Sequence, residues 1–407
     1  TRPARLDRAA GQGRKPIWLA CLLSVFFIGM VEQSVAGSRE QARRIHDRLA
    51  GVPPSDLVLQ SMEDDINGVG GRTMIDAAYT AMDNAAFYAV TLKNIAAPWT
   101  NRDEDIFVPL NDYIATYIGL VRDEADFRRV LYDDIVYVGN IATPYRVGDN
   151  DHYEELERTN VDLSNIANFF ASNQSLEAGL ATGATAGVMT SRSGARAFLV
   201  AGTNRAMFRY TMMNHLCYDM EQVKDTTRPA DRVRQDVSRS PGGDSRLYNN
   251  GCLGCHSGMD PFAQAFAYYQ WDYAGDPDSG NLRFTDGVVE AKYFNNATTF
   301  PYGYVTPDDR WDNFWRAGAN KKLLGWDTNG QGLPSGGNGA KTMGNELANS
   351  EAFARCHVQH AFESTCLREP VDQNDVNEIQ RITGVFKAQN YNLKRVFAET
   401  AAYCAGN

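Results

Sequence analysis

The chain lacks the short motifs that mark the common enzyme classes. It contains no zinc-protease HExxH, no Walker phosphate loop, no dinucleotide-binding glycine motif and no internal repeat. The glycine-rich run at 178–194 is not followed by Gly-Lys-Ser/Thr, so we interpret it as a connection between elements. The run at 327–330 resembles the start of a calcium loop, but the glutamate of a full motif is missing. These absences exclude most nucleotide-dependent and metalloprotease chemistry.

Positive charge is also scarce. Forty lysines and arginines are set against fifty aspartates and glutamates, which gives a formal net charge of −10. A chain this acidic is a poor partner for nucleic acid, so we expect none. A basic surface on another protein would be attracted to it.

One motif in the sequence carries chemistry directly. Cys252-Leu253-Gly254-Cys255-His256 has the CxxCH spacing of a c-type haem attachment site. Each thiol can bond to one vinyl group of the same porphyrin, and the histidine is then placed to bind the iron. There is no second CxxCH, so we predict one covalent haem c held by Cys252 and Cys255, with His256 as the proximal iron ligand.

Two alternatives for this CxxC are weaker. A zinc site needs a second pair of ligands, and the only closely spaced pair is His357 with His360. A redox-active dithiol of the thioredoxin kind needs a strand-helix-strand context, which the sequence does not indicate.

The first 36 residues have the organisation of an export signal. Five basic side chains precede an apolar run at 17–31, and Ser34 and Ala36 form a small-x-small cleavage site. We therefore expect the periplasmic or extracellular side. We leave open whether 1–36 is removed as a signal peptide or 17–31 stays as an inner-membrane anchor, although about 20 apolar residues are normally needed to span.

The cysteine count also favours an oxidising compartment. Apart from Cys21, in the apolar run, and the two motif cysteines, four cysteines remain. An even number suits two disulfides, with three possible connectivities. Cys356 and Cys366 would lie about 15 Å apart in one unbroken helix, too far for a bridge. Either that helix breaks, or each of the two pairs elsewhere. The four cysteines are Cys217, Cys356, Cys366 and Cys404.

Apolar periodicity predicts a mainly α fold. Ser55 is placed to cap a helix at 56–66, and a buried stripe from Ile75 to Ala96 predicts one long helix that ends before Pro98. We expect further helices at 40–50, 104–142, 162–174, 205–220, 345–367, 375–389 and 393–404.

Aromatic residues are concentrated after the haem motif. The segment 262–273 follows it directly, and a second group lies between 293 and 315. They could form the apolar wall that a porphyrin needs or an ordinary hydrophobic core, and the sequence does not decide between the two. The second group is Tyr293, Phe294, Phe300, Tyr302, Tyr304, Trp311, Phe314 and Trp315.

The motif CxxCHxxMDP at 252–261 resembles that of the planctomycete-type cytochrome c domains, in which a short aromatic-rich helix follows the motif. The likeness extends loosely to 186–190, Arg205, 216–217 and 353–356, while 48–55 resembles a helical domain that accompanies such cytochromes. The resemblance implies an exported, helical haem protein, with a helical domain at 38–200 and a monohaem cytochrome c domain at 201–407. It names no substrate.

The distal iron ligand is less well defined. Met259 follows His256 too closely to reach the other face of the porphyrin. Met343 follows a glycine-rich loop and precedes a closing helix, as does the ligating loop methionine of small class I cytochromes, and we predict it as the ligand. His215, His357 and His360 are the rivals.

Three functions remain open at this stage. We favour an electron carrier, a subunit of a membrane-associated redox complex that exchanges electrons with other cytochromes or redox proteins. The alternatives are a peroxidase-like haem enzyme with an open distal position, and a structural subunit with an accessory haem. The number of axial ligands separates the first two.

Overall fold

Helices dominate the computed structural model, which describes residues 36–406 except 201, 233–245, 247 and 295–303. The fold is mainly α, as the apolar periodicity predicts. The export segment 1–35 lies outside the described residues, as do Phe300 and Tyr302. The α-helices are α1 (Ser38–Ala50), α2 (Asp56–Ile66), α3 (Met74–Met82), α4 (Lys93–Ala96), α5 (Asp112–Arg122), α6 (Arg129–Tyr132), α7 (Asp151–Arg158), α8 (Gln174–Glu177), α9 (Arg192–Phe198), α10 (Arg205–Leu216), α13 (Leu253–Ala263), α14 (Gly339–Ala348), α15 (Glu351–Cys366), α16 (Gln373–Ala388) and α17 (Leu393–Cys404).

The strands among the described residues form three small antiparallel pairs. They are β1 (Val136–Gly139) with β2 (Phe169–Ser172), β3 (Tyr269–Asp272) with β4 (Asn281–Phe284), and β5 (Arg310–Asp312) with β6 (Gly336–Asn338). Short 3₁₀ or π turns connect the elements, and those used below are η2 (Phe87–Leu92), η3 (Ala97–Thr100), η5 (Tyr248–Cys252), η6 (Gln264–Phe266), η7 (Pro277–Ser279) and η9 (Phe314–Arg316).

The predicted helix ends at the start of the chain are confirmed. The Ser55 hydroxyl accepts a hydrogen bond from the backbone N–H of Val58, which caps α2 as its position indicated. Gly51 ends α1 in the left-handed region, with φ of 71°, and its N–H bonds back to the carbonyl of Asp47.

Several predicted helices are wrong in extent or type. The helix expected at 345–367 is interrupted, because α14 ends at Ala348 and α15 begins at Glu351, and the one expected at 205–220 ends at Leu216. The stripe from Ile75 to Ala96 does not form one helix, because α3 ends at Met82 and the chain resumes as η2 and α4. The Asn84 side chain accepts the N–H of Ala86 at 2.9 Å, a local bond that competes with helix continuation. The segment 162–174 contains strand β2 instead of a helix, because its Phe169–Ser172 run pairs with β1.

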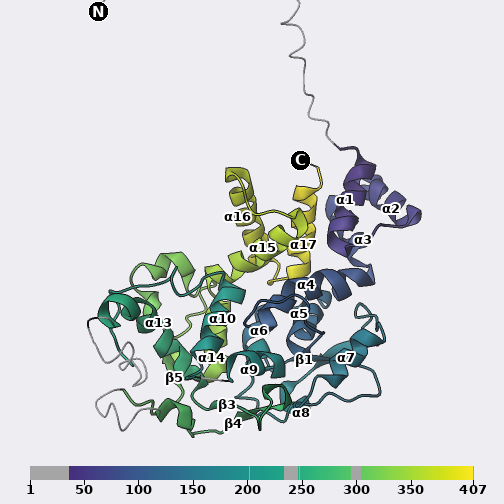
Figure 1. Ribbon diagram of the computed structural model, residues 1–407. Coiled ribbons are helices and arrows are strands. Elements are labelled where there is room, and N and C mark those ends of the chain that lie inside the picture. Colours follow the sequence, from purple (N-terminus) through teal and green to yellow (C-terminus); the bar gives the residue numbers. More distant parts are fainter. Residues whose placement is uncertain (1–35, 201, 233–245, 247, 295–303, 407) are drawn as a thin grey trace, which may run out of the picture.

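The last helices return to the beginning of the chain. α17 packs on α1 and α3, and α15 lies between α17 and α10. Figure 1 shows α15, α16 and α17 beside α1 and α3, with α13 on the opposite side of the molecule. One hydrophobic core runs through residues of both predicted ranges, 38–200 and 201–407.

Two disulfides tie these helices together. Cys217, after α10, is bonded to Cys356 on α15, and Cys366 at the end of α15 is bonded to Cys404 on α17. Because α15 is unbroken from Glu351 to Cys366, Cys356 and Cys366 pair elsewhere, which was one of the two predicted outcomes.

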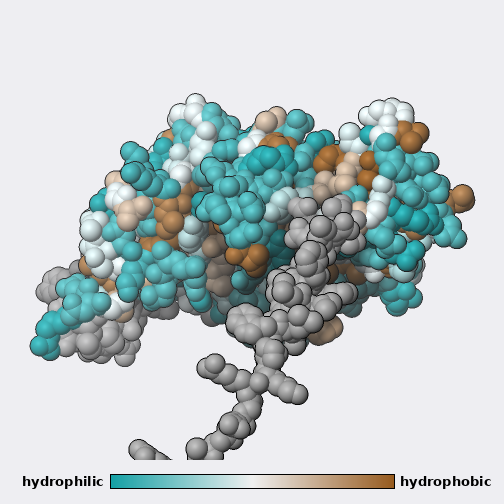
Figure 2. Space-filling view, turned by 90° about the horizontal axis from the view of Figure 1, so that it is seen from above, coloured by the Kyte–Doolittle hydropathy of each residue, from teal (hydrophilic) through white to brown (hydrophobic). Residues whose placement is uncertain are grey.

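One face of the molecule is mostly polar. Figure 2 shows a face on which hydrophobic residues form small separate patches among hydrophilic ones. Within the described part of the chain, no helix combines the length and the hydropathy needed to cross a bilayer. The predicted anchor, 17–31, lies outside that part.

Candidate haem-attachment site

The CxxCH motif forms the first turn of α13. Cys252 is the residue before the helix, and Cys255 and His256 lie in its first turn. A Cβ atom at Gly258 would lie 2.0 Å from the indole of Trp315, so only glycine allows α13 to pack this closely on that ring. The packing fixes the rotation of α13 and therefore the direction of the motif side chains.

Cys252 and Cys255 are the only free cysteines in the described part of the chain. Both are half-buried, and the Cys255 thiol lies 3.5 Å from the carbonyl oxygen of Met220. Burial raises the pKa of Cys255, whereas reactive dithiols have a lowered thiol pKa. The Cys255 thiol therefore lacks the lowered pKa that marks a redox-active dithiol.

His256 is held by a buried carboxylate. Its Nδ1 lies 3.1 Å from Oδ1 of Asp260, one helical turn later, and the His256 side chain is 19% exposed. Asp260 is fully buried and also accepts from Nε of Arg205 on α10 at 2.7 Å. When Nδ1 of the neutral His256 imidazole carries the proton, it donates a hydrogen bond to Asp260. Nε2 is then unprotonated, and its lone pair can bind a metal ion. The His256 side chain thus fits the role of proximal ligand.

Sequence reasoning missed Asp260 and Arg205 as parts of this site. The four-residue spacing from His256 to Asp260 on a helix was a usable signal, because such side chains are neighbours. The family resemblance included Arg205 and the Asp260 of CxxCHxxMDP, but it assigned neither of them a role, and no spacing rule linked Arg205 to the motif. α10 approaches α13 only through tertiary packing, in which the rings of Phe208 and Phe262 stack with centroids 4.8 Å apart.

Met343 lies in a different setting from the one expected. It belongs to α14 itself, not to the loop before it, and it is fully buried in the main core. α14 packs mainly on α6, β6 and η6. The predicted loop position is therefore wrong, and the ligand role stays a prediction.

The three rival histidines come together at the junction of α10 and α15. Nδ1 of His215 lies 3.2 Å from Nε2 of His357, and Nε2 of His360 lies 3.4 Å from the sulfur of Cys356. Burial lowers the pKa of His215 to about 3 and that of His360 to about 4, and it holds the pKa of His357 well below its ordinary value. All three are therefore neutral at physiological pH.

A chain of hydrogen bonds orders these imidazoles. Burial raises the pKa of Tyr113, so its hydroxyl keeps its proton and donates to Nε2 of His215 at 2.7 Å. His215 can then donate from Nδ1 to His357, which leaves Nδ1 of His357 without a partner. Cys217, Cys356 and His360 have the spacing of a metal site, but the disulfide consumes both thiolates.

The aromatic residues after the motif pack on one another. The ring of Phe262 stacks on Trp311 with centroids 5.7 Å apart and also meets Trp315 and Trp326 at 5.8 and 6.0 Å. Trp311 and Trp315 are almost completely buried. Trp311 and Trp315 thus belong to the main hydrophobic core, and Tyr293 lies in a second, small cluster with Ala267 and Tyr268. A porphyrin wall formed by these aromatics stays a prediction.

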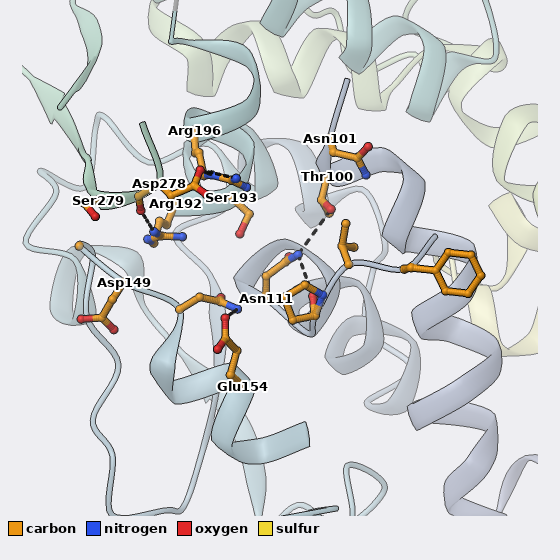
Figure 3. A pocket seen from close by; sticks show the side chains of 15 residues that line it. Thr100, Asn101, Asn111, Asp149, Glu154, Arg192, Ser193, Arg196, Asp278 and Ser279 are labelled. Carbon is orange, nitrogen blue, oxygen red and sulfur yellow. Dashed lines mark hydrogen bonds and ion pairs between the residues drawn. The ribbon is translucent and has the colours of Figure 1, made fainter. Parts of the chain in front are cut away.

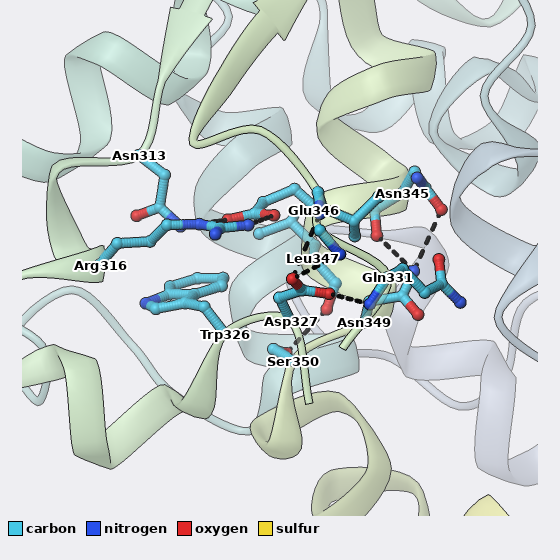
Figure 4. A network of polar contacts seen from close by, with 12 residues as sticks. Asn313, Arg316, Trp326, Asp327, Gln331, Asn345, Glu346, Leu347, Asn349 and Ser350 are labelled. Carbon is cyan, nitrogen blue, oxygen red and sulfur yellow. Dashed lines mark hydrogen bonds and ion pairs between the residues drawn. The ribbon is translucent and has the colours of Figure 1, made fainter. Parts of the chain in front are cut away.

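In the loop before α14, one side chain, Asp327, binds several backbone N–H groups. The Asp327 carboxylate accepts N–H groups from Gln331, Gly332 and Leu333 at 3.0 to 3.2 Å. Nearby, the buried carboxylate of Glu346 accepts hydrogen bonds from Nε and Nη2 of Arg316. This ion pair joins α14 to η9 (Figure 4). Asp327 therefore stabilises the loop.

Comparison with known proteins identified no relative of this chain. The chain matches no family model, no curated protein and no solved structure. The interpretation of the site accordingly depends on the motif and its geometry.

Proposed function

We propose that the protein is an exported monohaem c-type cytochrome that carries electrons. The single observation that supports this most is the state of its cysteines. Cys252 and Cys255 stay unpaired at the start of α13 beside His256, while the other described cysteines form disulfides. A bound haem would supply a one-electron couple at the iron.

The chain's own residues have separate tasks in this proposal. Cys252 and Cys255 would hold the porphyrin covalently, and Nε2 of His256 would bind its iron. Asp260, held by Arg205, fixes the orientation of the imidazole and increases its basicity.

Charge and disulfides support the proposed location and partners. The predicted export signal at 1–36 and the two disulfides suit the periplasmic or extracellular side. The net charge of −10 favours a redox partner with a basic docking surface. Membrane association would depend on 17–31.

Met343 remains our proposed distal ligand, with His215, His357 and His360 as alternatives. A neutral thioether stabilises ferrous iron relative to an imidazole, which suits electron transfer. If Met343 is the ligand, Met343→Ala should open the sixth position and lower the potential. An unchanged spectrum and potential would exclude it.

A second candidate, a haem enzyme with an open distal site, is favoured by the pairing of His256 with Asp260. A carboxylate bonded to the proximal histidine increases electron donation to the iron. A structural subunit with an accessory haem is the third alternative.

Two measurements test these functions. The native, exported protein should keep haem stain after denaturing electrophoresis, and a colourless band would refute the proposal. A reduced-minus-oxidised spectrum that carbon monoxide leaves unchanged supports an electron carrier with two axial ligands, whereas binding of the gas supports the enzyme.

A further inference from the structure

A polar pocket lies away from the haem motif, between the start of α9 and the segment that leads into α7. Its volume is about 390 Å³, within the range of small-molecule sites. Figure 3 shows Arg192 and Ser193 from α9 on one side, with Asp149 and Glu154 on the other. The remaining walls come from η3, η7 and the segment before α5.

The guanidinium of Arg192 is the unusual group in this pocket. Arg192 is 8% exposed, yet no carboxylate of the described chain forms an ion pair with its guanidinium, and its Nε has no hydrogen-bond partner. The other arginines buried to this degree, Arg122 and Arg232, are each paired with a carboxylate, Asp123 and Asp312. A buried charge without a counterion is costly, so an anionic group from outside the chain is the natural partner.

The side chain of Asp112 fixes the backbone of Arg192 and Ser193. The buried carboxylate of Asp112 accepts the backbone N–H groups of both, at 2.5 and 3.0 Å. The Arg192 guanidinium donates only to the backbone carbonyl of Asp278, and the hydroxyl of Ser193 lines the pocket without a hydrogen bond of its own to the described chain. A cation and a hydroxyl donor are thus pre-organised side by side.

The charge of the opposite wall restricts the ligand further. Arg196 is already paired with the side chain of Asp278, so Arg192 faces the two carboxylates of Asp149 and Glu154 across the pocket. A dianion would be repelled by those carboxylates, and a simple cation would leave Arg192 unpaired. A ligand with one charge of each sign satisfies both walls.

We propose that this pocket binds a free α-amino acid. Its carboxylate pairs with Arg192 and Ser193, and its ammonium group faces Asp149 and Glu154. The inference does not depend on the haem.

The test is calorimetric titration of the full-length protein as purified, with glycine, L-alanine and L-leucine. Ethylamine and propanoate are the matched probes for alanine, because each lacks one of its charged groups. At least one amino acid should bind, and the matched amine and acid should bind about tenfold or more weakly than alanine. If no amino acid binds with a Kd below about 1 mM, or if propanoate binds as well as alanine, the proposal is overturned.

Variants locate the site. Arg192→Gln should weaken binding about ten- to a hundredfold, and Asp149→Asn should weaken amino-acid binding but not propanoate binding. Arg122→Gln is the matched control, because it also removes a buried arginine but lies outside the pocket. It should lower the melting temperature and leave the affinity unchanged. If Arg192→Gln does not fold, Ser193→Ala should still bind several-fold more weakly, and unchanged affinity in that variant refutes the site.

Discussion

Two regions of the molecule contain the same residue types, cysteine and histidine, in opposite states. At the α10–α15 junction, Cys217 and Cys356 are bonded to each other. Beside them His215 and His357 are buried and His360 is half-buried, and all three are neutral at physiological pH. At the start of α13, Cys252 and Cys255 are free and half-buried, and His256 is partly exposed.

The difference lies in what surrounds the groups. At the junction, aromatic rings fill the space, and the ring of Trp99 lies 5.5, 6.0 and 4.9 Å from those of His215, His357 and His360. Disulfide formation and desolvation there remove the nucleophiles and the charge. At α13 a buried carboxylate orients the imidazole instead. The junction therefore stabilises the fold, and the motif remains available for chemistry.

The largest effect should come from removing the two free thiols. In Cys252→Ala with Cys255→Ala, no haem should remain on the chain after denaturing electrophoresis, because no other described thiol is free. The control, Cys366→Ala with Cys404→Ala, should keep the stain. Stain that survives in the first variant would place the attachment elsewhere.

The second test compares the two disulfides by stability. The Cys217–Cys356 bond closes a loop of 139 residues and the Cys366–Cys404 bond one of 38. Chain entropy predicts losses in the free energy of unfolding of about 5 and about 4 kcal/mol when each pair is replaced by alanine. Urea denaturation measures both, and a greater loss for the shorter loop would show that local packing outweighs loop entropy.

The third test uses pH. The pKa of His360 is about 4 in the folded protein because of burial, against about 6.5 when unfolded. Below pH 6.5 the unfolded state binds more protons, so stability is complete above that pH and is lost as the pH falls toward 4. The loss from His360 alone should be on the order of 3 kcal/mol by pH 4.

His360→Gln removes this titration. The free energy of unfolding of the variant, from urea titrations between pH 7 and pH 5, should fall less steeply than that of the parent. Carboxylates contribute little to the slope there, because their unfolded pKa lies near 4. Equal slopes would mean that His360 is not buried as described.

Much of the fold could be predicted, because it depends on local signals. The Ser55 cap and the closing helices follow from local signals. For Cys356 and Cys366 the spacing left two outcomes, a broken helix or pairing elsewhere, and the unbroken α15 decided between them. The strand Phe169–Ser172 could not be predicted, since its partner Val136–Gly139 is distant in sequence and only tertiary pairing selects a strand there. The break after Met82 depends on one local bond of Asn84.

The candidate site divides in the same way. Cys252, Cys255 and His256 form a contiguous motif that the sequence displays in full. Arg205 reaches Asp260 from another helix, so no spacing rule reveals it. For the same reason the pocket at Arg192 carries no motif, because its walls come from segments that only the fold brings together.

The smallest expected effect is a change in redox potential at the motif. Asp260→Asn keeps the shape of the side chain but removes the negative charge that bonds to Nδ1 of His256. The imidazole then donates less electron density, ferric iron loses stabilisation relative to ferrous iron, and the midpoint potential should rise. The expected shift is on the order of 60 mV, equivalent to a tenfold change in one equilibrium constant.

Asp375→Asn is the control, because Asp375 is also a buried carboxylate paired with an arginine, Arg368, but lies in the closing helices. It should lower stability and leave the potential unchanged, which redox titration of the two haem-loaded variants would establish. If both variants shift the potential equally, the His256–Asp260 contact has no special influence on the haem, and the two regions would differ only in their burial and in the bonding state of their cysteines.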